Sequence, residues 1–372
     1  MPDYSQKEEG SWGREWGENK AFGSRDTVLN FRDHPAGDQK PKLKTMPTEK
    51  TNSIILSARG VKKYFPVRRG FLQKVIGWVK AVDGVDLEIR PAQTLGLVGE
   101  SGCGKTTMAQ LILKLIEPDA GTICFRGQNI TYFSPEEMKP LRKEIQIVFQ
   151  DPYGSLNPRM SVGQSIEEGL RDRGDKVWRR ERVRELLEMV GMPGNVGDRY
   201  PHEFSGGQRQ RIGIARALSV EPSLIICDEP VSALDVSIQA QIINLLKSLQ
   251  ARLGLSYLFI AHDLNVVEYI SDTLGVMYLG HMMEYGPADL IYDHPLHPYS
   301  LGLMASVPVP EPGAKREWHP LKGDVPTPFN PPPGCKFQGR CPLAEERCRR
   351  GEIEFFPVEN GRRVRCWKVL GK

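Results

Sequence analysis

The stretch GESGCGKTT, residues 99–107, is the most informative part of this sequence. It matches the pattern G-x-x-x-x-G-K-[ST], with the strand-like run TLGLV before it and a helix-like run after it. Glycines let backbone N–H groups surround phosphate oxygens, and a helix N-terminus adds the positive end of its dipole. A nucleotide site is therefore expected here, formed by Gly99, Glu100, Ser101, Gly102, Cys103, Gly104, Lys105, Thr106 and Thr107.

Three side chains of this loop have an expected task. Lys105 should place a positive charge against the β- and γ-phosphates, and the hydroxyl of Thr106 should bind Mg²⁺. Cys103 is expected to fill space inside the loop instead of sensing the redox state.

Two acidic residues follow another apolar run, in LIICDEP. The carboxyl end of a parallel strand faces the ligand crevice of an α/β sheet. Asp228 is therefore expected to hold Mg²⁺ through water, and Glu229 to polarise the attacking water as a general base. An acidic pair that merely opens a solvent loop is the alternative, and the phosphate loop upstream argues against it.

The pattern of apolar residues predicts an α/β fold. Four short apolar runs are typical of strands buried on both faces of a parallel sheet, at residues 95–98, 145–149, 224–227 and 257–260. Helix-period patterns lie between them, one through Val183, Leu186, Leu187 and Val190 and another through Leu111, Leu113 and Leu115. Strands that alternate with helices indicate a sheet covered by helices.

Composition excludes several classes of protein. Lys and Arg total 50 against 46 for Asp and Glu, and this near balance gives no basic face that would indicate a nucleic-acid partner. No run approaches the roughly 20 apolar residues of a membrane-spanning helix, and residues 1–20 lack the apolar segment of a secretory signal. We therefore expect a chain that is neither membrane-embedded nor exported. Its seven cysteines then indicate free thiols or a metal site.

The two ends of the chain differ from its middle. Residues 1–50 are rich in charge and Gly and poor in Ile, Leu and Val, so a disordered extension is expected. Eleven of the 29 prolines lie between Pro295 and Pro333, which predicts an extended connector without regular helix. The expected division is an extension over 1–50, a nucleotide-binding cassette over 51–292, and the connector with a four-cysteine module over 293–372.

The sequence FSGGQ, residues 204–208, resembles the signature motif of ABC transporter ATPases, with Phe204 where Leu is usual. Other motifs of that family follow in order: Gln150 resembles the Q-loop glutamine, SALD at 232–235 the D-loop, and His262 the switch histidine. Phe65 stands where the family has an aromatic that stacks on adenine, with Tyr64 as the fallback. The resemblance implies a P-loop NTPase cassette with a RecA-like core, an antiparallel β subdomain, and a helical insertion over about 151–215.

The resemblance also implies how the residues act. In this family two cassettes pair head to tail and enclose two ATP molecules. The residues that would face the ATP held by the partner's phosphate loop are Ser205, Gly206, Gly207, Gln208 and Asp235. Gln150 would sense the γ-phosphate through Mg²⁺, and His262 would help Glu229 position the water. Catalytic roles are thus expected for Glu229, His262 and Gln150, and Mg²⁺ binding for Thr106, Gln150 and Asp228.

Longer stretches narrow the resemblance to peptide importers. The runs that begin at Phe149, Tyr200, Asp228 and His294 are similar to the second of the two ATPases of oligopeptide and dipeptide systems. This implies two membrane permeases, an unlike ATPase partner and an external binding protein, with the chain peripheral on the cytoplasmic face of the membrane. The cargo is inherited from the resemblance, and nickel or oligosaccharide importers remain alternatives. His294 and His297 are expected to serve packing or a turn.

The C-terminal cysteines are separated by five, six and seventeen residues: Cys335, Cys341, Cys348 and Cys366. Zinc ribbons usually show closely spaced cysteine pairs, absent here, whereas an iron–sulfur cluster also takes four thiolates. The importer family resembled here carries this cysteine set with a [4Fe–4S] cluster, which is therefore the expected occupant, with zinc or free thiols as the alternatives. A cluster would staple a module too small to fold unaided.

Two other classes of function are kept open at this point. One is an ABC-type ATPase that acts on ribosomes or nucleic acid, but such proteins typically carry two cassettes in one chain or long insertions between motifs. The other is a regulatory ATP-binding protein without turnover, against which Glu229 and His262 both argue.

Overall fold

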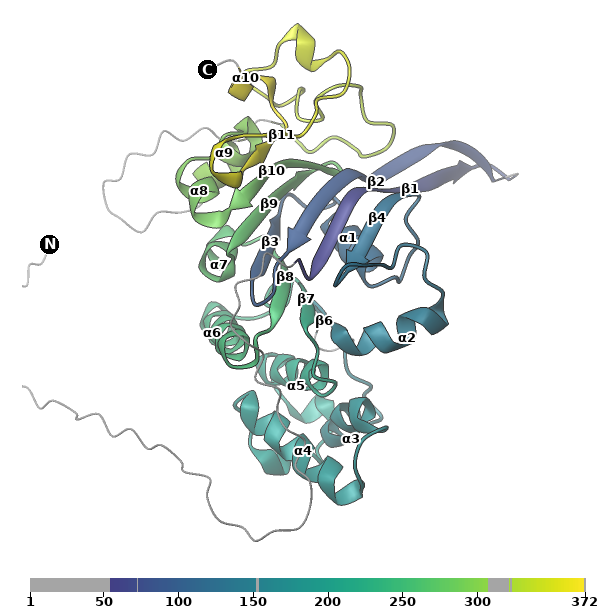
Figure 1. The fold of residues 1–372 in the computed structure, drawn as a ribbon, viewed down its shortest axis with the longest axis vertical. Coiled ribbons are helices and arrows are strands. Elements are labelled where there is room, and N and C mark those ends of the chain that lie inside the picture. Colours follow the sequence, from purple (N-terminus) through teal and green to yellow (C-terminus); the bar gives the residue numbers. More distant parts are fainter. Residues whose placement is uncertain (1–53, 72, 152–153, 307–320, 322, 371–372) are drawn as a thin grey trace, which may run out of the picture. The chain divides into compact units, whose positions relative to one another are not determined.

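The computed structural model describes residues 54–71, 73–151, 154–306, 321 and 323–370. The expectation of disorder over residues 1–50 lies outside these residues. Within them, helices alternate with strands along most of the chain, and two sheets form (Figure 1).

Eight strands form the larger sheet, in the order β11-β12-β10-β9-β3-β8-β7-β6. Their bounds are β3 Thr94–Val98, β6 Ile145–Val148, β7 Leu224–Asp228, β8 Ser256–Ile260, β9 Thr273–Tyr278, β10 His281–Pro287, β11 Phe356–Pro357 and β12 Arg363–Val364. The five strands from β9 to β6 are parallel, and the four apolar runs predicted all of them except β9. Strands β10, β12 and β11 continue the sheet with antiparallel pairing.

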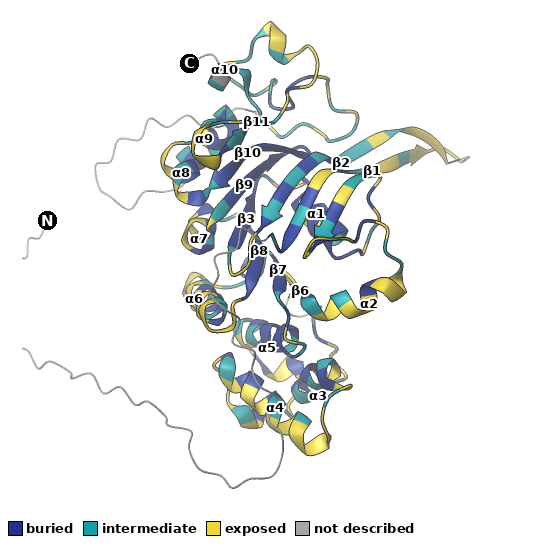
Figure 2. Ribbon diagram, viewed as in Figure 1, coloured by how far each residue is buried: buried dark blue, intermediate teal, exposed yellow. Residues whose placement is uncertain are grey.

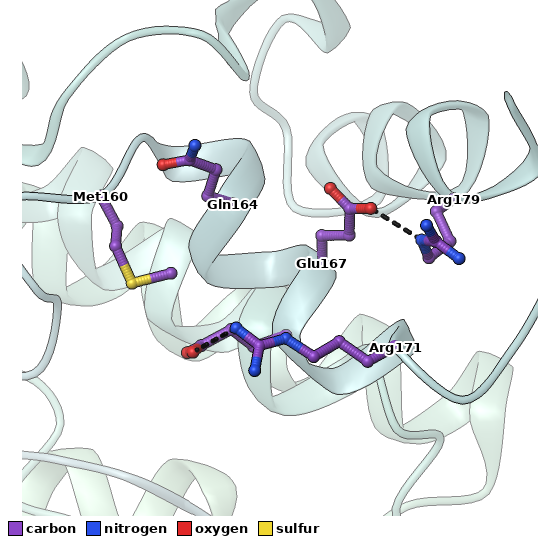
Figure 3. A pocket seen from close by; sticks show the side chains of 6 residues that line it. Met160, Gln164, Glu167, Arg171 and Arg179 are labelled. Carbon is purple, nitrogen blue, oxygen red and sulfur yellow. Dashed lines mark hydrogen bonds and ion pairs between the residues drawn. The ribbon is translucent and has the colours of Figure 1, made fainter. Parts of the chain in front are cut away.

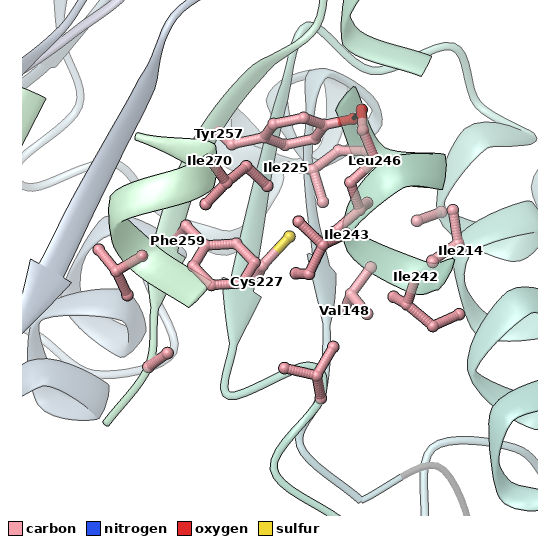
Figure 4. Close-up of a cluster of buried hydrophobic side chains, with 14 of the residues drawn as sticks. Val148, Ile214, Ile225, Cys227, Ile242, Ile243, Leu246, Tyr257, Phe259 and Ile270 are labelled. Atoms are coloured by element: carbon pink, nitrogen blue, oxygen red, sulfur yellow. Dashed lines mark hydrogen bonds between the residues drawn. The ribbon is translucent and has the colours of Figure 1, made fainter. Parts of the chain in front are cut away.

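The parallel strands are buried on both faces, which explains their continuous apolar sequences (Figure 2). Along β7, Leu224 and Ile226 belong to one core while Ile225 and Cys227 belong to the other. Figure 4 shows the second of these cores, in which side chains of the sheet pack against helices α5 and α6, Gly206–Leu218 and Val236–Leu253. The core on the opposite face includes residues of α1 and of the smaller sheet.

The smaller sheet is antiparallel, in the order β2-β1-β4-β5. Its strands are β1 Leu56–Arg69, β2 Lys74–Ile89, β4 Ala120–Phe125 and β5 Gln128–Asn129. Strand β1 pairs with β4 only as far as Lys62, so beyond that residue β1 and β2 continue as a two-stranded ribbon. The antiparallel subdomain expected of an ABC cassette is therefore present.

The remaining helices have the following bounds: α1 Lys105–Ile112, α2 Pro135–Glu144, α3 Val162–Glu167, α4 Lys176–Met189, α7 Leu264–Ile270, α8 Ala288–Asp293, α9 Pro298–Ala305 and α10 Trp367–Leu370. Short 3-10 turns cover 168–170, 194–196, 201–203, 346–348 and 359–361. Helices α3, α4 and α5 contact one another between β6 and β7, where the helical insertion was expected. No helix among the described residues is both long and apolar enough to cross a bilayer.

Two expectations about local structure were wrong. Helix α1 ends at Ile112, because Lys114 has a φ of +54° that no helix continues through, and Leu115 beyond it is exposed. The proline-rich segment contains a regular helix, α9. Pro298 occupies its first position, where a missing N–H costs nothing, and His297 Nδ1 accepts the amide of Tyr299 as the N-cap. His297 thus has the turn role expected for it.

The last part of the chain adds to the edge of the larger sheet. Strand β12 pairs with β10 through Glu284 and Tyr285. Behind this pairing Arg362 donates to the fully buried carboxylate of Glu284. The buried charge is thereby neutralised by a residue 78 positions later.

Candidate functional site

Predicted site residues follow four neighbouring strands at the same edge of the sheet. Gly99 follows β3, His262 lies two residues after β8, Asp228 ends β7, and Gln150 lies two residues after β6. Because these strands are parallel and adjacent in the order β3-β8-β7-β6, their carboxyl ends meet at one edge. The fold therefore gathers residues that are up to about 160 positions apart in sequence.

The phosphate loop folds around its own lysine. Lys105 begins helix α1 and is 5% exposed. Its ammonium donates to the carbonyl oxygens of Gly99 at 2.7 Å and Glu100 at 3.2 Å. Cys103 is buried, and burial raises the pKa of its thiol, as suits the filler role expected for it. The ammonium is thus held over a loop whose Ser101, Gly102 and Thr106 are exposed, with Thr107 half-buried.

Two glycines of this loop are required by close backbone contacts. A Cβ on Gly104 would lie 2.1 Å from the carbonyl oxygen of Ala81, and Gly104 has a φ of +109°. A Cβ on Gly99 would lie 2.1 Å from the carbonyl oxygen of Met277. No other residue fits at these positions without moving β2 or β9.

Thr106 and Asp228 form the first polar pair of the site. The hydroxyl of Thr106 donates to Oδ1 of Asp228 at 3.2 Å. Burial raises the pKa of the Asp228 carboxyl; the hydrogen bond from Thr106 opposes this shift, and the charge of Glu229 adds to it. The Thr106 hydroxyl and the Asp228 carboxylate are oxygen ligands of the kind that a divalent cation prefers. A bound cation would also stabilise the Asp228 charge that burial disfavours.

Glu229 is the centre of the second polar group. Its Oε2 accepts a hydrogen bond from Gln150 Nε2 at 3.0 Å and lies 3.4 Å from His262 Nδ1. Its backbone has a φ of +49°, a conformation that costs a non-glycine residue about 1–3 kcal/mol. Its N–H donates to the carbonyl of Ile260, and its own carbonyl accepts the hydroxyl of Ser232. The strained backbone is thus held from two sides, which fixes where the carboxylate points.

The signature residues are arranged around the start of α5. Ser205 is the N-cap: its hydroxyl accepts the amide of Gln208 at 3.4 Å, and Oε1 of Gln208 accepts the amide of Ser205 at 3.0 Å. Gly206 and Gly207 form the first turn. Among the described residues, no hydrogen bond joins these four to Lys105 or Glu229. Asp235, the N-cap of α6, is exposed and uses no side-chain oxygen for capping.

The two aromatic candidates for adenine stacking have different environments in the structure. Phe65 on β1 is 38% exposed and pairs across the sheet with Val79, two residues before the Ala81 that abuts the phosphate loop. Tyr64 is engaged elsewhere, because its hydroxyl donates to Asp83 at 2.5 Å. An exposed ring near the loop fits the role better than one committed to a buried carboxylate.

Sequence reasoning missed the side chains that hold Glu100. Arg340 forms two hydrogen bonds with its carboxylate, at 2.7 and 3.1 Å, and the amide of Glu100 donates to the hydroxyl of Tyr299 at 3.0 Å. Hydrogen bonding to Glu100 raises the pKa of the Arg340 guanidinium above its usual range. Nothing in the local sequence distinguishes Arg340 from the other arginines of the same segment, so no signal could have found it.

The four C-terminal cysteines all line one small apolar cavity of about 20 Å³, together with His297 and Trp367. Burial raises the pKa of Cys335 to about 11 and raises the pKa values of Cys341 and Cys366. As they stand, no three His, Cys, Asp or Glu side chains within the described ranges are arranged to hold a metal ion. The thiols are therefore gathered without forming a ready metal cage.

A separate cavity of about 460 Å³ lies in the helical insertion (Figure 3). Charged side chains dominate its lining and form internal pairs: Arg171 donates to Glu168 at 3.2 Å, and Arg179 donates to Glu167 at 2.7 Å. Met160 supplies an apolar side chain at the same cavity.

Comparisons with known proteins agree with this geometry. The ABC transporter family model matches residues 82–232, and the model described as "Oligopeptide/dipeptide transporter, C-terminal region" matches residues 283–348. Among solved structures, cbiO1 of Clostridium perfringens, part of an ABC transporter complex, shares 27% identity at a TM-score of 0.57, over 65% of this chain and 92% of that one. A dimeric ATP-binding cassette, MJ0796 bound to ADP and Pi, shares 27% identity at a TM-score of 0.56, over 63% and 98%.

Curated relatives match over nearly their whole length. The oligopeptide transport ATP-binding protein AppF of Bacillus subtilis is 52% identical over 86% of this chain and 98% of its own. A putative peptide import ATP-binding protein of Brucella ovis is 50% identical over 85% and 98%. With the phosphate loop, the acidic pair and the signature helix in their expected order, this chain belongs to the family of ABC transporter ATP-binding proteins of the oligopeptide/dipeptide type.

Proposed function

We propose that this protein is the ATP-hydrolysing subunit of an ABC importer for oligopeptides or dipeptides. The observation that carries the proposal is the meeting of Lys105, Thr106, Asp228 and the Gln150–Glu229–His262 group at one sheet edge, in a chain of this family. ATP and Mg²⁺ are the ligands such a site requires. We divide the chain as expected from sequence, with the cassette over 51–292.

The residues take the following parts in hydrolysis. The backbone amides of the phosphate loop and Lys105 would hold the phosphates, and Thr106, with Asp228 acting through water, would hold Mg²⁺, which would offset the phosphate charge. Glu229 accepts the proton of the attacking water, with His262 beside it to orient that water and contact the γ-phosphate. Gln150 donates to Glu229 and would also help to hold Mg²⁺. Positioning and charge stabilisation supply most of the rate in such reactions.

A second ATPase completes the site. The signature helix exposes Ser205 and Gln208 at its N-terminus, beside two half-buried glycines, and makes no hydrogen bond to the chain's own phosphate loop within the described residues. Ser205, Gly206, Gly207 and Gln208, with Asp235, therefore act on the ATP held by the partner, where the helix dipole favours phosphate. We infer an unlike ATPase as the partner, as in the two-ATPase systems that the chain resembles.

Phe65 stacks on the adenine ring in this proposal. Its support is the exposed ring on β1 beside Ala81, together with the commitment of Tyr64 to Asp83. Base stacking on an aromatic side chain tolerates any base, so it adds affinity more than specificity.

The helical insertion receives a short cytoplasmic helix of a permease. The cavity lined by Met160, Gln164 and the two internal ion pairs offers an apolar contact rimmed by charges, as a docked helix would use. Two permeases and an external substrate-binding protein complete the importer, with this chain peripheral on the cytoplasmic face of the membrane. Peptide cargo is supported by the names of its relatives, and nickel or oligosaccharide is the alternative.

The four C-terminal cysteines bind a [4Fe–4S] cluster in this proposal, with zinc as the alternative. The chemistry of the donor set fits, because four thiols and no competing carboxylate line the same cavity. Ligation requires loss of the thiol protons, whose pKa values burial has raised. A cluster would staple residues 334–370, which form only short strands and turns.

Reconstitution tests the function as a whole. The chain should be co-expressed with its candidate permeases and second ATPase, placed in liposomes, and assayed for phosphate release with and without binding protein and peptides. We expect hydrolysis that rises severalfold with peptide-loaded binding protein. Stimulation by nickel or oligosaccharide instead would reassign the cargo, and stimulation by ribosomes or nucleic acid alone would contradict an importer.

The cysteine site has its own test. Iron, acid-labile sulfide and zinc are measured on anaerobically purified full-length protein, for the unaltered chain and for Cys348→Ser. Four iron and four sulfide per chain, lost in the variant, are expected for the cluster. The matched control is Cys124→Ser on β4, which should keep the full content. A colourless protein with one zinc per chain would contradict our choice.

A further inference from the structure

The C-terminal segment that carries the cysteines also contacts the phosphate loop. Arg340 lies between the first two of these cysteines and forms its paired hydrogen bonds with the carboxylate of Glu100, 240 residues earlier. The side chain of Arg340 is 7% exposed and that of Glu100 is 24% exposed. A two-pronged ion pair with so little access to water fixes both the distance and the direction between its partners.

The guanidinium of Arg340 is itself held in place. Its central carbon lies 5.8 Å from the ring centre of Tyr278, and its Nη1 lies 3.5 Å from the hydroxyl of the same residue. Tyr278 packs against Tyr299 and Phe337, with ring centres 4.7 and 5.4 Å away. The backbone amide of Arg340 donates to the carbonyl of Phe337 at 3.0 Å. Arg340 is therefore fixed to the C-terminal segment, and a shift of that segment would move its partner Glu100.

Glu100 in turn determines where the phosphate-binding lysine lies. Its carbonyl oxygen accepts the ammonium of Lys105 at 3.2 Å and the amide of Cys103 at 3.2 Å. Its own amide is held by Tyr299, from helix α9. A displacement of Glu100 would therefore move two groups of the phosphate loop, the Lys105 ammonium and the Cys103 amide.

The cysteines determine where Arg340 lies. The amide of Gln338 donates to the carbonyl of Cys335, and the amide of Cys335 donates to the carbonyl of Cys348. Arg340 is thus part of a short turn whose two ends are cysteines of the common cavity. Binding or loss of a ligand at those thiols would therefore change the conformation of this turn.

We propose that Arg340 is a positioning residue of the phosphate loop, and that through its pair with Glu100 the state of the four-cysteine site sets the affinity for ATP. The inference rests on the proposed function only in that the loop binds ATP. It concerns binding and not the chemical step, because neither Glu229 nor His262 contacts the pair.

A double-mutant cycle tests the ion pair. Arg340→Gln, Glu100→Gln and the double variant of the full chain are compared by equilibrium binding of a non-hydrolysable ATP analogue, and by KM and kcat of hydrolysis. Each single change should weaken binding and raise KM about 5- to 10-fold, with kcat changed less than twofold. The double variant should be no weaker than either single variant, because both remove the same interaction. Arg340→Lys, which keeps the charge without the fork, should restore part of the affinity.

The control lies in the same segment. Arg350 pairs with Glu346, four residues away, and both side chains are exposed. Arg350→Gln removes an equal charge without touching the phosphate loop, so ATP binding should not change. Equal losses in Arg350→Gln and Arg340→Gln would show a general charge effect and overturn the proposal, as would additive losses in the cycle.

The link to the cysteines is tested on the same scale. Cys341→Ser should weaken ATP binding about as much as Arg340→Gln, and should have no further effect when combined with it. Unchanged binding in Cys341→Ser overturns the link between the cysteine site and ATP. Should Arg340→Gln fail to fold, as judged by its thermal transition, Arg340→Lys takes its place in both cycles. An unaltered chain that binds no ATP would contradict the proposed function instead.

Discussion

The side-chain amide of Gln150 donates a hydrogen bond of 3.0 Å to Oε2 of Glu229, across 79 residues of sequence. Gln150 lies where the chain leaves β6 for the helical insertion, and Glu229 lies where it leaves β7. The same oxygen faces His262 at 3.4 Å. Movement of the insertion would therefore shift Gln150 and change its hydrogen bond with the carboxylate that we propose as the general base.

Replacement of Glu229 by Gln should separate binding from hydrolysis. The amide keeps the size of the side chain but cannot accept a proton, so hydrolysis should fall at least ~100-fold while ATP still binds. Phosphate release and equilibrium ATP binding measure the two effects. Near-normal turnover in Glu229→Gln would remove Glu229 from the mechanism.

Asp228→Asn should stabilise the ligand-free protein and weaken its response to Mg²⁺ and ATP. Burial raises the folded-state pKa of Asp228 above its unfolded value, so the ionised carboxylate opposes folding at pH values above the unfolded pKa of about 4. Removal of the charge should therefore raise Tm at pH 7, and the gain should disappear as the pH falls below about 4.

With MgATP present, the effect of Asp228→Asn on Tm should be the opposite. MgATP should raise the Tm of the unaltered chain by mass action and that of Asp228→Asn far less. Asp289→Asn, on the exposed start of α8, is the control and should alter neither value. A ligand-free Tm that falls in Asp228→Asn would show that this carboxylate is stabilising as it stands.

The two neighbouring aromatics on β1 should differ in their effect on nucleotide binding. Stacking on a base contributes about 1–3 kcal/mol, so Phe65→Ala should weaken ATP binding by about 5- to 150-fold. Tyr64→Phe removes only the hydroxyl that donates to Asp83 and should leave ATP affinity within twofold. Titration of each variant with a fluorescent ATP analogue compares them, and unchanged affinity in Phe65→Ala would remove this ring from the adenine contact.

Asp83 should make stability depend on pH. Burial alone would raise the pKa of this carboxyl, but the nearby His281, 3.4 Å away, the hydrogen bond from Tyr64 and the charge of Lys80 outweigh it and hold the pKa well below its usual range. A depressed folded-state pKa contributes stability above the unfolded value of about 4, and this contribution is lost as the pH falls through the folded-state pKa.

Asp83→Asn should therefore lower the free energy of unfolding by about 1–3 kcal/mol at pH 7, because the amide still accepts from Tyr64 but lacks the charge that Lys62 and Lys80 face. The difference from the unaltered chain should shrink progressively below pH 4. Urea unfolding from pH 7 to pH 3 measures it. Asp172→Asn, which breaks the exposed pair with Lys143, should cause little change at any pH.

The parallel strands were predictable because each one is a continuous apolar run, as Leu224 to Cys227 shows. Residues at their carboxyl ends share one edge by topology alone, so Gln150, Asp228 and His262 could be placed together from sequence. Local chemistry misled in two places. Prolines that suggested an extended connector include one that begins α9, and the apolar residues that continue past α1 meet a left-handed turn at Lys114.

The contacts of Arg340 mark the limit of such reasoning. A residue's local sequence reports its periodicity and its neighbours, whereas the pair of Arg340 and Glu100 depends on how two segments 240 residues apart are brought together. Ion pairs between distant segments leave no pattern in a single sequence. The choice between Phe65 and Tyr64 for adenine stacking could not be made from sequence either. It depends on the hydrogen bond between Tyr64 and Asp83, which only the folded structure shows.

The pairing of β12 with β10 has a consequence for synthesis. A chain made from its N-terminus completes β10 while the ribosome still has about 75 residues to add before Val364 appears. Until then β10 presents an unpaired edge, and the carboxylate of Glu284 lacks Arg362. A nascent or prematurely terminated chain would therefore expose both an aggregation-prone edge strand and an uncompensated charge. Both features make it a substrate for chaperones and proteases.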